Sequence, residues 1–414
     1  MAKRATFTAC CLALTMFASR PAQAQGLPDH PLVLGDGHVK LGGDVSWSLA
    51  PEDTGFFNYT DYERSTLRLL RLTLLATVKA GDHIEVLSEI RSENGGRPDP
   101  YALYLRVRPW TDRNLDVQVG RLPPTFGAFA RRAYAADNPL IGYPLAYQYL
   151  TSIRPDALPA SVDELLRMRG RGWLSNFSLG NLAPAPGVPL VSAFRWDTGV
   201  QVHAGNDLLD ATAAVTAGTL SNPEVTDDNS GRQLAGRIAL HPVAGLVVGA
   251  SAARGPFVSQ SAVAATAVPD ARGSDFTQTA WGGDLEYSRG YYVVRLETVV
   301  SRWTLPLTTP LTTPLATAPL AELGLTAVAT SVEGRYKIRP GLYAAARFDH
   351  LGFSELEGST GRRSWDAPVT RWEVGGGYSL QRNLVLKLAY QHNRRDGGRV
   401  QDLGLATAQI MFWF

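Results

Sequence analysis

The clearest candidate for chemistry in this chain is a run of basic residues at alternate positions. Arg167, Arg169 and Arg171 precede Gly172 and Trp173. A guanidinium group keeps its charge at every accessible pH and presents a planar set of donors that matches carboxylate and phosphate. Two interpretations are open. The arginines are either solvated side chains of a loop or a cationic rim that faces the acids of the same segment.

Other residue patterns give weaker indications of chemistry. The seven histidines are scattered, and none has zinc-ligand spacing with a second His or Cys. The run Asp227-Asp228-Asn229 could hold calcium but lacks the EF-hand pattern. The chain has no Gly-x-Ser-x-Gly elbow, no phosphate-binding loop and no nucleophile with an obvious base. We therefore expect no catalytic residue, no metal and no cofactor.

The N-terminal segment predicts export. Lys3 and Arg4 precede an apolar run over residues 9–18, and Ala22-Gln23-Ala24 offers a cleavage site, which is the layout of a signal peptide. Residues 1–24 are assigned to this signal and residues 25–414 to one domain. Both cysteines, at positions 10 and 11, lie in the signal, so no disulfide is expected. A lipoprotein anchor at Cys10 is a weaker alternative, because few apolar residues precede it.

Nothing in the charge balance suggests a polyanion-binding protein. Removal of Lys3, Arg4 and Arg20 from 40 basic residues leaves 37 against 38 acidic residues, so the net charge changes from +2 to −1. Nucleic-acid binding needs an excess of basic charge. We expect no nucleic-acid partner.

Apolar and polar residues alternate along most of the chain, which predicts strands with two unlike faces. Leu70, Leu72 and Leu74, for example, oppose Arg71 and Thr73. The pattern recurs over residues 38–49, 84–91, 103–108, 115–119, 332–338 and 371–378. A soluble sandwich also alternates, so the connections must distinguish the two folds.

Short and long connections follow one another between the predicted strands. Short joints lie near residues 79–82, 109–114, 205–207, 242–244, 288–290, 339–341 and 381–382. Longer connections span residues 51–64, 92–99, 122–190, 220–230, 255–275, 304–321, 353–367 and 396–400. Seven turns and eight loops predict sixteen strands, the pattern of an outer-membrane barrel with short periplasmic turns and long external loops. Prolines in residues 305–320 favour an extended external loop there.

The segment over residues 122–190, here called the third loop, has an unusual composition. Residues 137–150 are rich in apolar and aromatic side chains, which predicts packing within the barrel wall or against a neighbouring subunit. Ser161 with Glu164 three residues later predicts a capping box at the start of a short helix. Asp163 and Glu164 would then lie in its first turn, where the helix dipole favours acids.

Two motifs resemble those of bacterial outer-membrane porins. The chain ends in Phe412-Trp413-Phe414, like the C-terminal strand that serves those barrels as an assembly signal. Residues 119–127, with Gly120-Arg121, Pro124 and Phe126-Gly127, resemble a strand exit of phosphate-selective porins. The resemblance implies an all-β, transmembrane antiparallel β-barrel of about 16 strands whose long third external loop folds into the lumen as a constriction.

The same resemblance implies a function and partners. The protein would be a passive channel for small hydrophilic solutes or ions in the outer membrane of a Gram-negative cell, with a weak preference for anions. It would contact outer-membrane lipid and lipopolysaccharide, meet the barrel-assembly machinery through Phe414 and form a homotrimer. The residues expected to line the pore are Arg71, Glu89, Arg91, Tyr104, Arg106, Arg108, Arg121, Arg131, Arg132, Asp137, Arg167, Arg169, Arg335, Arg347 and Arg371.

Alternatives to a passive channel remain. A lipase-type barrel enzyme needs a Ser and a His on the outer face, where only His350 beside Phe348 offers a candidate. A plugged receptor needs an N-terminal plug, but about a dozen residues separate the signal from the first strand. A channel for hydrophobic substrates is favoured only by the apolar third loop.

Overall fold

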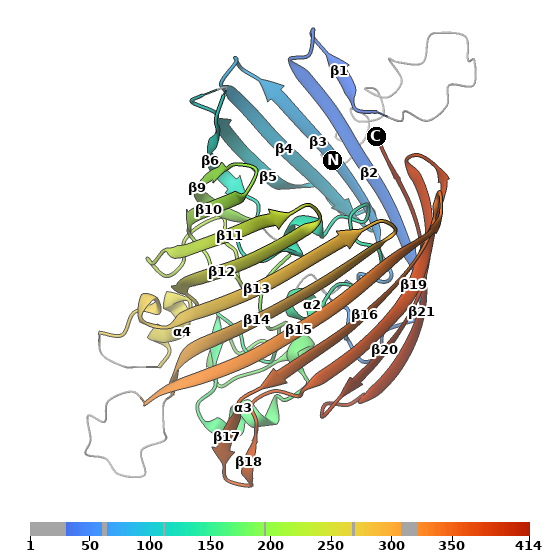
Figure 1. Ribbon diagram of the computed structural model, residues 1–414. Coiled ribbons are helices and arrows are strands. Elements are labelled where there is room, and N and C mark those ends of the chain that lie inside the picture. Colours follow the sequence, from blue (N-terminus) through green and yellow to red (C-terminus); the bar gives the residue numbers. More distant parts are fainter. Residues whose placement is uncertain (1–29, 60–63, 111, 194–195, 267–269, 308–320) are drawn as a thin grey trace, which may run out of the picture.

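A computed structural model describes residues 30–59, 64–110, 112–193, 196–266, 270–307 and 321–414. The predicted signal peptide lies outside these residues. Sixteen antiparallel strands form a closed ring, because β2 pairs with both β3 and β21 (Figure 1). They are β2 Val39–Leu49, β3 Leu70–Lys79, β4 Ile84–Glu93, β5 Asp99–Val107, β6 Asn114–Leu122, β9 Asp197–Gly205, β10 Leu209–Thr216, β11 Gln233–Val243, β12 Leu246–Pro256, β13 Thr277–Arg289, β14 Tyr292–Leu307, β15 Ala321–Arg339, β16 Leu342–Phe353, β19 Val369–Gln381, β20 Leu384–Arg395 and β21 Asp402–Trp413.

The two faces of the ring differ as the alternation predicts. Large apolar side chains point outward on almost every strand, and Trp281 is 60% exposed. Polar and charged side chains point inward and are buried, and Glu373 is 1% exposed. An apolar band of this extent around a closed barrel is the surface that a membrane protein presents to lipid. Closure also pairs the backbone groups of every strand, since a ring has no open edge.

The seam of the ring lies where the C-terminus meets β2. Phe414 and Gly43 exchange two backbone hydrogen bonds of 3.0 and 3.1 Å. A short strand, β1 Leu32–Leu34, pairs with Val39–Leu41 on the adjoining part of β2. The two segments therefore pair with successive parts of β2, and together they cover most of its length.

The third loop joins β6 to β9 and is the longest connection. It contains η1 Ala130–Arg132, α2 Leu145–Gln148, β7 Ala157–Leu158, α3 Val162–Arg167, η2 Gly172–Leu174 and β8 Leu179–Gly180. Ser161 caps α3 by accepting the N–H of Glu164 at 3.2 Å, as predicted. The Glu164 carboxylate, however, accepts the N–H of Ala160 at 2.6 Å, where the predicted box has it bind Ser161.

The apolar residues of the third loop pack inside the ring. Tyr143, Leu145, Tyr147 and Tyr149 are buried in one cluster. Inward-facing wall residues belong to the same cluster, among them Val299, Trp303, Leu325, Ala329 and Leu351. This shared cluster accounts for the apolar content of the segment.

Other loops differ in detail from the prediction. The connection before β13 holds α4 Gln260–Ala264 and η3 Gly273–Asp275, and the one before β19 holds a hairpin of β17 Glu355–Gly358 and β18 Gly361–Ser364. The assignment of residues 305–320 to a loop is wrong at its start, because Pro306 lies in β14 opposite Glu322. Proline removes only one donor from the ladder, and near a strand end that loss is small. Residues 308–320 lie outside the described residues.

Candidate functional site: the inner wall and the third loop

Two wall carboxylates hold the backbone of the third loop. Glu297 on β14 accepts the N–H groups of Ala128 and Phe129 at 2.8 and 3.2 Å, and the hydroxyl of Tyr147 at 2.5 Å. Glu373 on β19 accepts the N–H groups of Ile141 and Gly142 at 3.2 and 2.8 Å. Hydrogen bonds to an ionised acceptor are stronger than neutral ones. The loop is thus fixed at two points to the inward face of the wall.

Two wall cations bind loop carbonyl groups in the same way. Arg371 on β19 donates to the carbonyl oxygens of Tyr143 and Phe57, at 2.9 and 2.8 Å. Lys387 on β20 donates to the carbonyl oxygens of Ala135 and Asn138, at 2.6 and 2.5 Å. Both cations are buried. Several charged side chains on the inner face of the wall therefore hold the loops in position.

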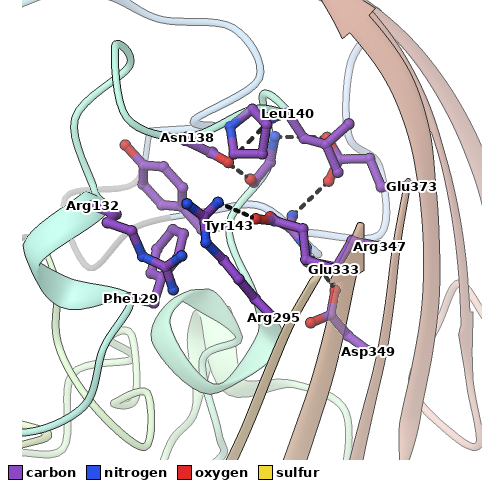
Figure 2. A network of polar contacts seen from close by, with 12 residues as sticks. Phe129, Arg132, Asn138, Leu140, Tyr143, Arg295, Glu333, Arg347, Asp349 and Glu373 are labelled. Carbon is purple, nitrogen blue, oxygen red and sulfur yellow. Dashed lines mark hydrogen bonds and ion pairs between the residues drawn. The ribbon is translucent and has the colours of Figure 1, made fainter. Parts of the chain in front are cut away.

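Arg347 on β16 joins three acids of the wall into one network (Figure 2). Its guanidinium lies 2.7 Å from Glu373, 3.1 Å from Asp349 and 3.4 Å from Glu333. Glu333 also bonds Arg295 at 3.0 Å. The side chain of Arg347 is completely buried, so its charge is balanced by these partners and not by water.

A second network lies on β3 and β4. Arg71 donates to the hydroxyl of Tyr143 at 3.2 Å and bonds Glu93. Arg91 pairs with Glu89 at 2.5 Å and lies 3.4 Å above the ring centroid of Tyr101. The loop reaches this group too, since the Tyr134 hydroxyl donates to Glu89 at 2.7 Å. Arg71, Glu89 and Arg91 thus lie on the inner face of the wall, in a network that contacts the loop.

Arg121 was assigned to the wrong face. Its strand partner is Leu103, and Leu103 and Val119 point outward. The guanidinium donates to the carbonyl oxygens of Trp196 and Pro100. Strict alternation places residue 121 with residues 117 and 119, whereas the prediction followed the porin-like motif.

Arg106 and Arg108 also depart from the expected constriction. Arg106 lies one residue from the β5–β6 turn, on the inward face, and forms an ion pair of 3.7 Å with Glu85. Arg108 is exposed and lies in that turn. Arg71 lies at the opposite end of its strand, next to the long connection. These side chains therefore lie at a different height along the barrel axis from Arg71 and do not form one ring with it. Alternation predicts which face of a strand a residue lies on, but it does not predict the height of that residue in the barrel.

The remaining predicted residues lie at several positions. Tyr104 faces inward and its hydroxyl accepts from Arg106 at 3.5 Å. Arg132 bonds Glu286 at 3.4 Å, and Arg131 lies in η1 beside it. Asp137 lies in the third loop with part of its surface exposed, and partial desolvation of its carboxyl group raises its pKa. Arg335 lies 6.0 Å from the ring centroid of Tyr343.

Arg167 and Arg169 lie at the loop end of the barrel and not in a constriction. Together with Arg171 they line a cavity of about 570 Å³ built from the first, third and last long connections. Its other lining residues include Phe56, Trp173, Arg395 and Arg399. The arginines at positions 167, 169 and 171 thus line one cavity, and Arg395 and Arg399, which are distant in sequence, line the same cavity.

A second cavity, of about 360 Å³, lies at the turn end. Arg335, Lys337 and Lys387 line it, and Ala136 and Pro139 of the third loop form one side. The lining of both cavities, within the described residues, contains basic side chains and no carboxylate. The third loop touches both, and the two cavities lie toward opposite ends of the barrel.

The contacts of three wall residues with the loop were not predicted from the sequence. Glu297, Glu373 and Lys387 fall on polar faces of their strands, but nothing in the local pattern marks them as contacts of the loop. The only sequence signal for these contacts was an inward-facing charge in a barrel whose third loop is apolar.

The stretch of chain that the structure describes contains no group of three or more His, Cys, Asp or Glu side chains placed to hold a metal. No helix in it is long and apolar enough to cross a membrane.

His350, the histidine named for the enzyme alternative, lies on the outer face of β16. Its Nδ1 lies 3.1 Å from the Thr370 hydroxyl at an exposed position. A lipase-type site requires a serine as nucleophile beside the histidine.

No protein-family model and no curated protein matches the chain. Solved structures share its fold. The outer membrane channel DcaP of Acinetobacter baumannii matches with a TM-score of 0.52 over 93% of this chain and 100% of its own, at 13% identity. The anion-selective porin from Comamonas acidovorans matches with a TM-score of 0.52 over 91% and 99%, at 10% identity. OmpT of Vibrio cholerae, in a trimer form, matches with a TM-score of 0.51 over 93% and 100%, at 13% identity. The chain therefore has the fold of the bacterial outer-membrane porins, a closed antiparallel barrel of sixteen strands.

Proposed function

We propose that the protein is an outer-membrane channel for the passive diffusion of small hydrophilic solutes, with a weak preference for anions. The observation that carries this proposal is the pair of cavities, one toward each end of the barrel, lined by arginine and lysine without any carboxylate. A solute that passes the third loop would meet basic side chains before and after it. Charge lining a narrow passage selects ions of the opposite sign.

The wall charges explain why the preference should be weak. Arg347, Arg295 and Arg91 are paired with acids. Arg371 and Lys387 are bonded to loop carbonyl oxygens. Screening confines the effect of any remaining charge to about 8 Å at physiological salt. Selectivity should therefore depend on Arg335, Lys337 and the arginines of the loop-end cavity.

Location and assembly belong to the same proposal. The exposed apolar face fits outer-membrane lipid, and lipopolysaccharide would cover its external part. The predicted signal peptide would direct export, and Phe414 would present the last strand to the assembly machinery. We expect a homotrimer, since OmpT of Vibrio cholerae, which shares the fold, forms one.

Reversal potential in a planar bilayer with a potassium chloride gradient tests the proposal. The wild-type channel should reverse toward the chloride potential, and Arg335→Gln combined with Lys337→Gln should shift it toward cations. Arg289→Gln is the matched control, because Arg289 is exposed in the β13–β14 turn region and does not line the cavity. A wild-type preference for potassium would contradict the anion assignment, and absence of any conductance would contradict the channel itself.

A further inference from the structure

The cavity at the loop end is built as a cationic pocket. Five arginines line it, from three separate parts of the chain: Arg167, Arg169, Arg171, Arg395 and Arg399. Its volume of about 570 Å³ lies within the range of pockets that hold small molecules. Like charges gathered in one concave site repel each other, so an anion that enters relieves that repulsion and gains field strength from the low-dielectric walls.

Few of these arginines are neutralised by acids. Arg167 lies 3.5 Å from Glu164 and Arg169 lies 3.9 Å from Asp396, a side chain that is 85% exposed. Within the described part of the chain, Arg171, Arg395 and Arg399 form no ion pair with a carboxylate. Arg395 is held instead by the carbonyl oxygens of Gly397 and Val400, at 3.1 and 2.9 Å. Its position is therefore fixed by backbone carbonyl oxygens, and the charge of the buried Asp366 carboxylate acts on it without a direct ion pair.

The same pocket contains an aromatic platform. Phe56 and Trp173 both line it and stack with ring centroids 3.6 Å apart and planes 7° from parallel. Phe56 has a φ of 56°, a conformation that a bulky residue rarely adopts. The surrounding structure thus keeps this ring against Trp173 despite an unfavourable backbone geometry. Both rings are half-buried, so part of each remains accessible from the cavity.

We propose that this pocket binds small aromatic carboxylates at the loop-end mouth of the channel. Arginine donors match the planar geometry of a carboxylate, and a flat ring packs against the Phe56–Trp173 pair as aromatic groups do in binding pockets. This inference rests on the proposed channel function, and it names the solute class that the channel collects. A guanidinium also binds phosphate, so lipopolysaccharide phosphates are the other source of a matching anion.

Isothermal titration calorimetry on the refolded barrel in detergent, at low ionic strength, tests the site. Terephthalate should bind about tenfold more tightly than trans-1,4-cyclohexanedicarboxylate, which carries the same charges without an aromatic face. Arg171→Gln combined with Arg399→Gln should weaken terephthalate binding by about tenfold or more, because two charge-assisted contacts are lost. Trp173→Leu should remove the difference between the two probes.

Arg363→Gln is the matched control. Arg363 is an exposed arginine on the nearby β17–β18 hairpin and does not line the cavity, so its replacement should leave binding unchanged. Equal affinity of the Arg171→Gln, Arg399→Gln variant and the wild type would overturn the proposal, as would absence of terephthalate binding. Displacement of terephthalate by purified lipopolysaccharide would assign the pocket to lipid phosphates and also overturn it.

Conductance separates the two proposals. A channel that conducts with an anion preference but does not bind terephthalate would overturn only the binding site. A barrel that binds terephthalate but does not conduct would keep the site and overturn the channel function.

Discussion

The ring of Phe126 lies directly against Gly282 of β13, so that an added Cβ there would be 2.9 Å from its Cζ atom. Phe126 is completely buried at the start of the third loop. The following residue, Gly127, has a φ of 77°, and a Cβ there would collide with the Tyr147 hydroxyl. The absence of two side chains therefore lets the loop approach the wall at this point.

Gly282→Ala should loosen the third loop and raise single-channel conductance. The new methyl group must displace the Phe126 ring, and overpacking of this kind costs about 1–3 kcal/mol. Gly283→Ala is a control one residue away, because nothing lies within 4 Å of its added Cβ. Planar-bilayer recordings of both variants check this. Equal conductance in the Gly282→Ala variant and the wild type would mean that Phe126 does not control the passage.

Arg347→Met should destabilise the barrel strongly. It leaves Glu333, Asp349 and Glu373 buried without their shared cation, and breaking a buried ion pair costs about 3–5 kcal/mol. The temperature at which the barrel loses its compact mobility on a gel should fall. Arg363→Met, at an exposed position, should leave that temperature unchanged. A similar small effect of both changes would show that the network is not stabilising.

Deletion of Phe414 should impair barrel assembly in cells. Its backbone closes the seam with Gly43, and its ring packs against Gly43 and near Phe412. Phe414→Tyr keeps the backbone pairing and an aromatic ring, so it should assemble almost normally. The amount of heat-modifiable protein in outer-membrane fractions measures both. Normal assembly without residue 414 would exclude its role as a signal.

The connection between β10 and β11 should loosen as pH rises. Burial, followed by the charge of Asp228, raises the pKa of Glu224 from 4.5 to about 8. Between these values the ordered loop holds a proton that the disordered loop releases, so its stability is greatest below about pH 4.5 and is lost as pH approaches 8. Hydrogen-exchange protection of residues 217–232, corrected for intrinsic rates, should follow this trend. Glu224→Gln should flatten it, and protection that increases with pH would contradict the assignment.

The sequence predicts the wall of this protein better than its interior. Alternation identifies strand faces because each side chain meets either an apolar or a polar surface, and the order of short and long connections gives the strand number. Arg121 shows the limit of motif similarity, because its own alternation places it outside. Arg106 shows that a face does not specify a height. The contacts of Glu297 and Glu373 with the loop join residues 168 and 231 positions apart, which no local pattern encodes.

The apolar cluster of the third loop makes the interior of this barrel resemble the core of a small soluble domain enclosed by a membrane wall. Its aromatic residues pack on one another and on the inner wall, so we expect them to separate from the wall as one cooperative unit with a single free energy of opening. A close-packed unit of this kind has two discrete arrangements and not a continuous series. Any widening of the passage should therefore occur as a discrete, all-or-none step, with current that jumps between levels.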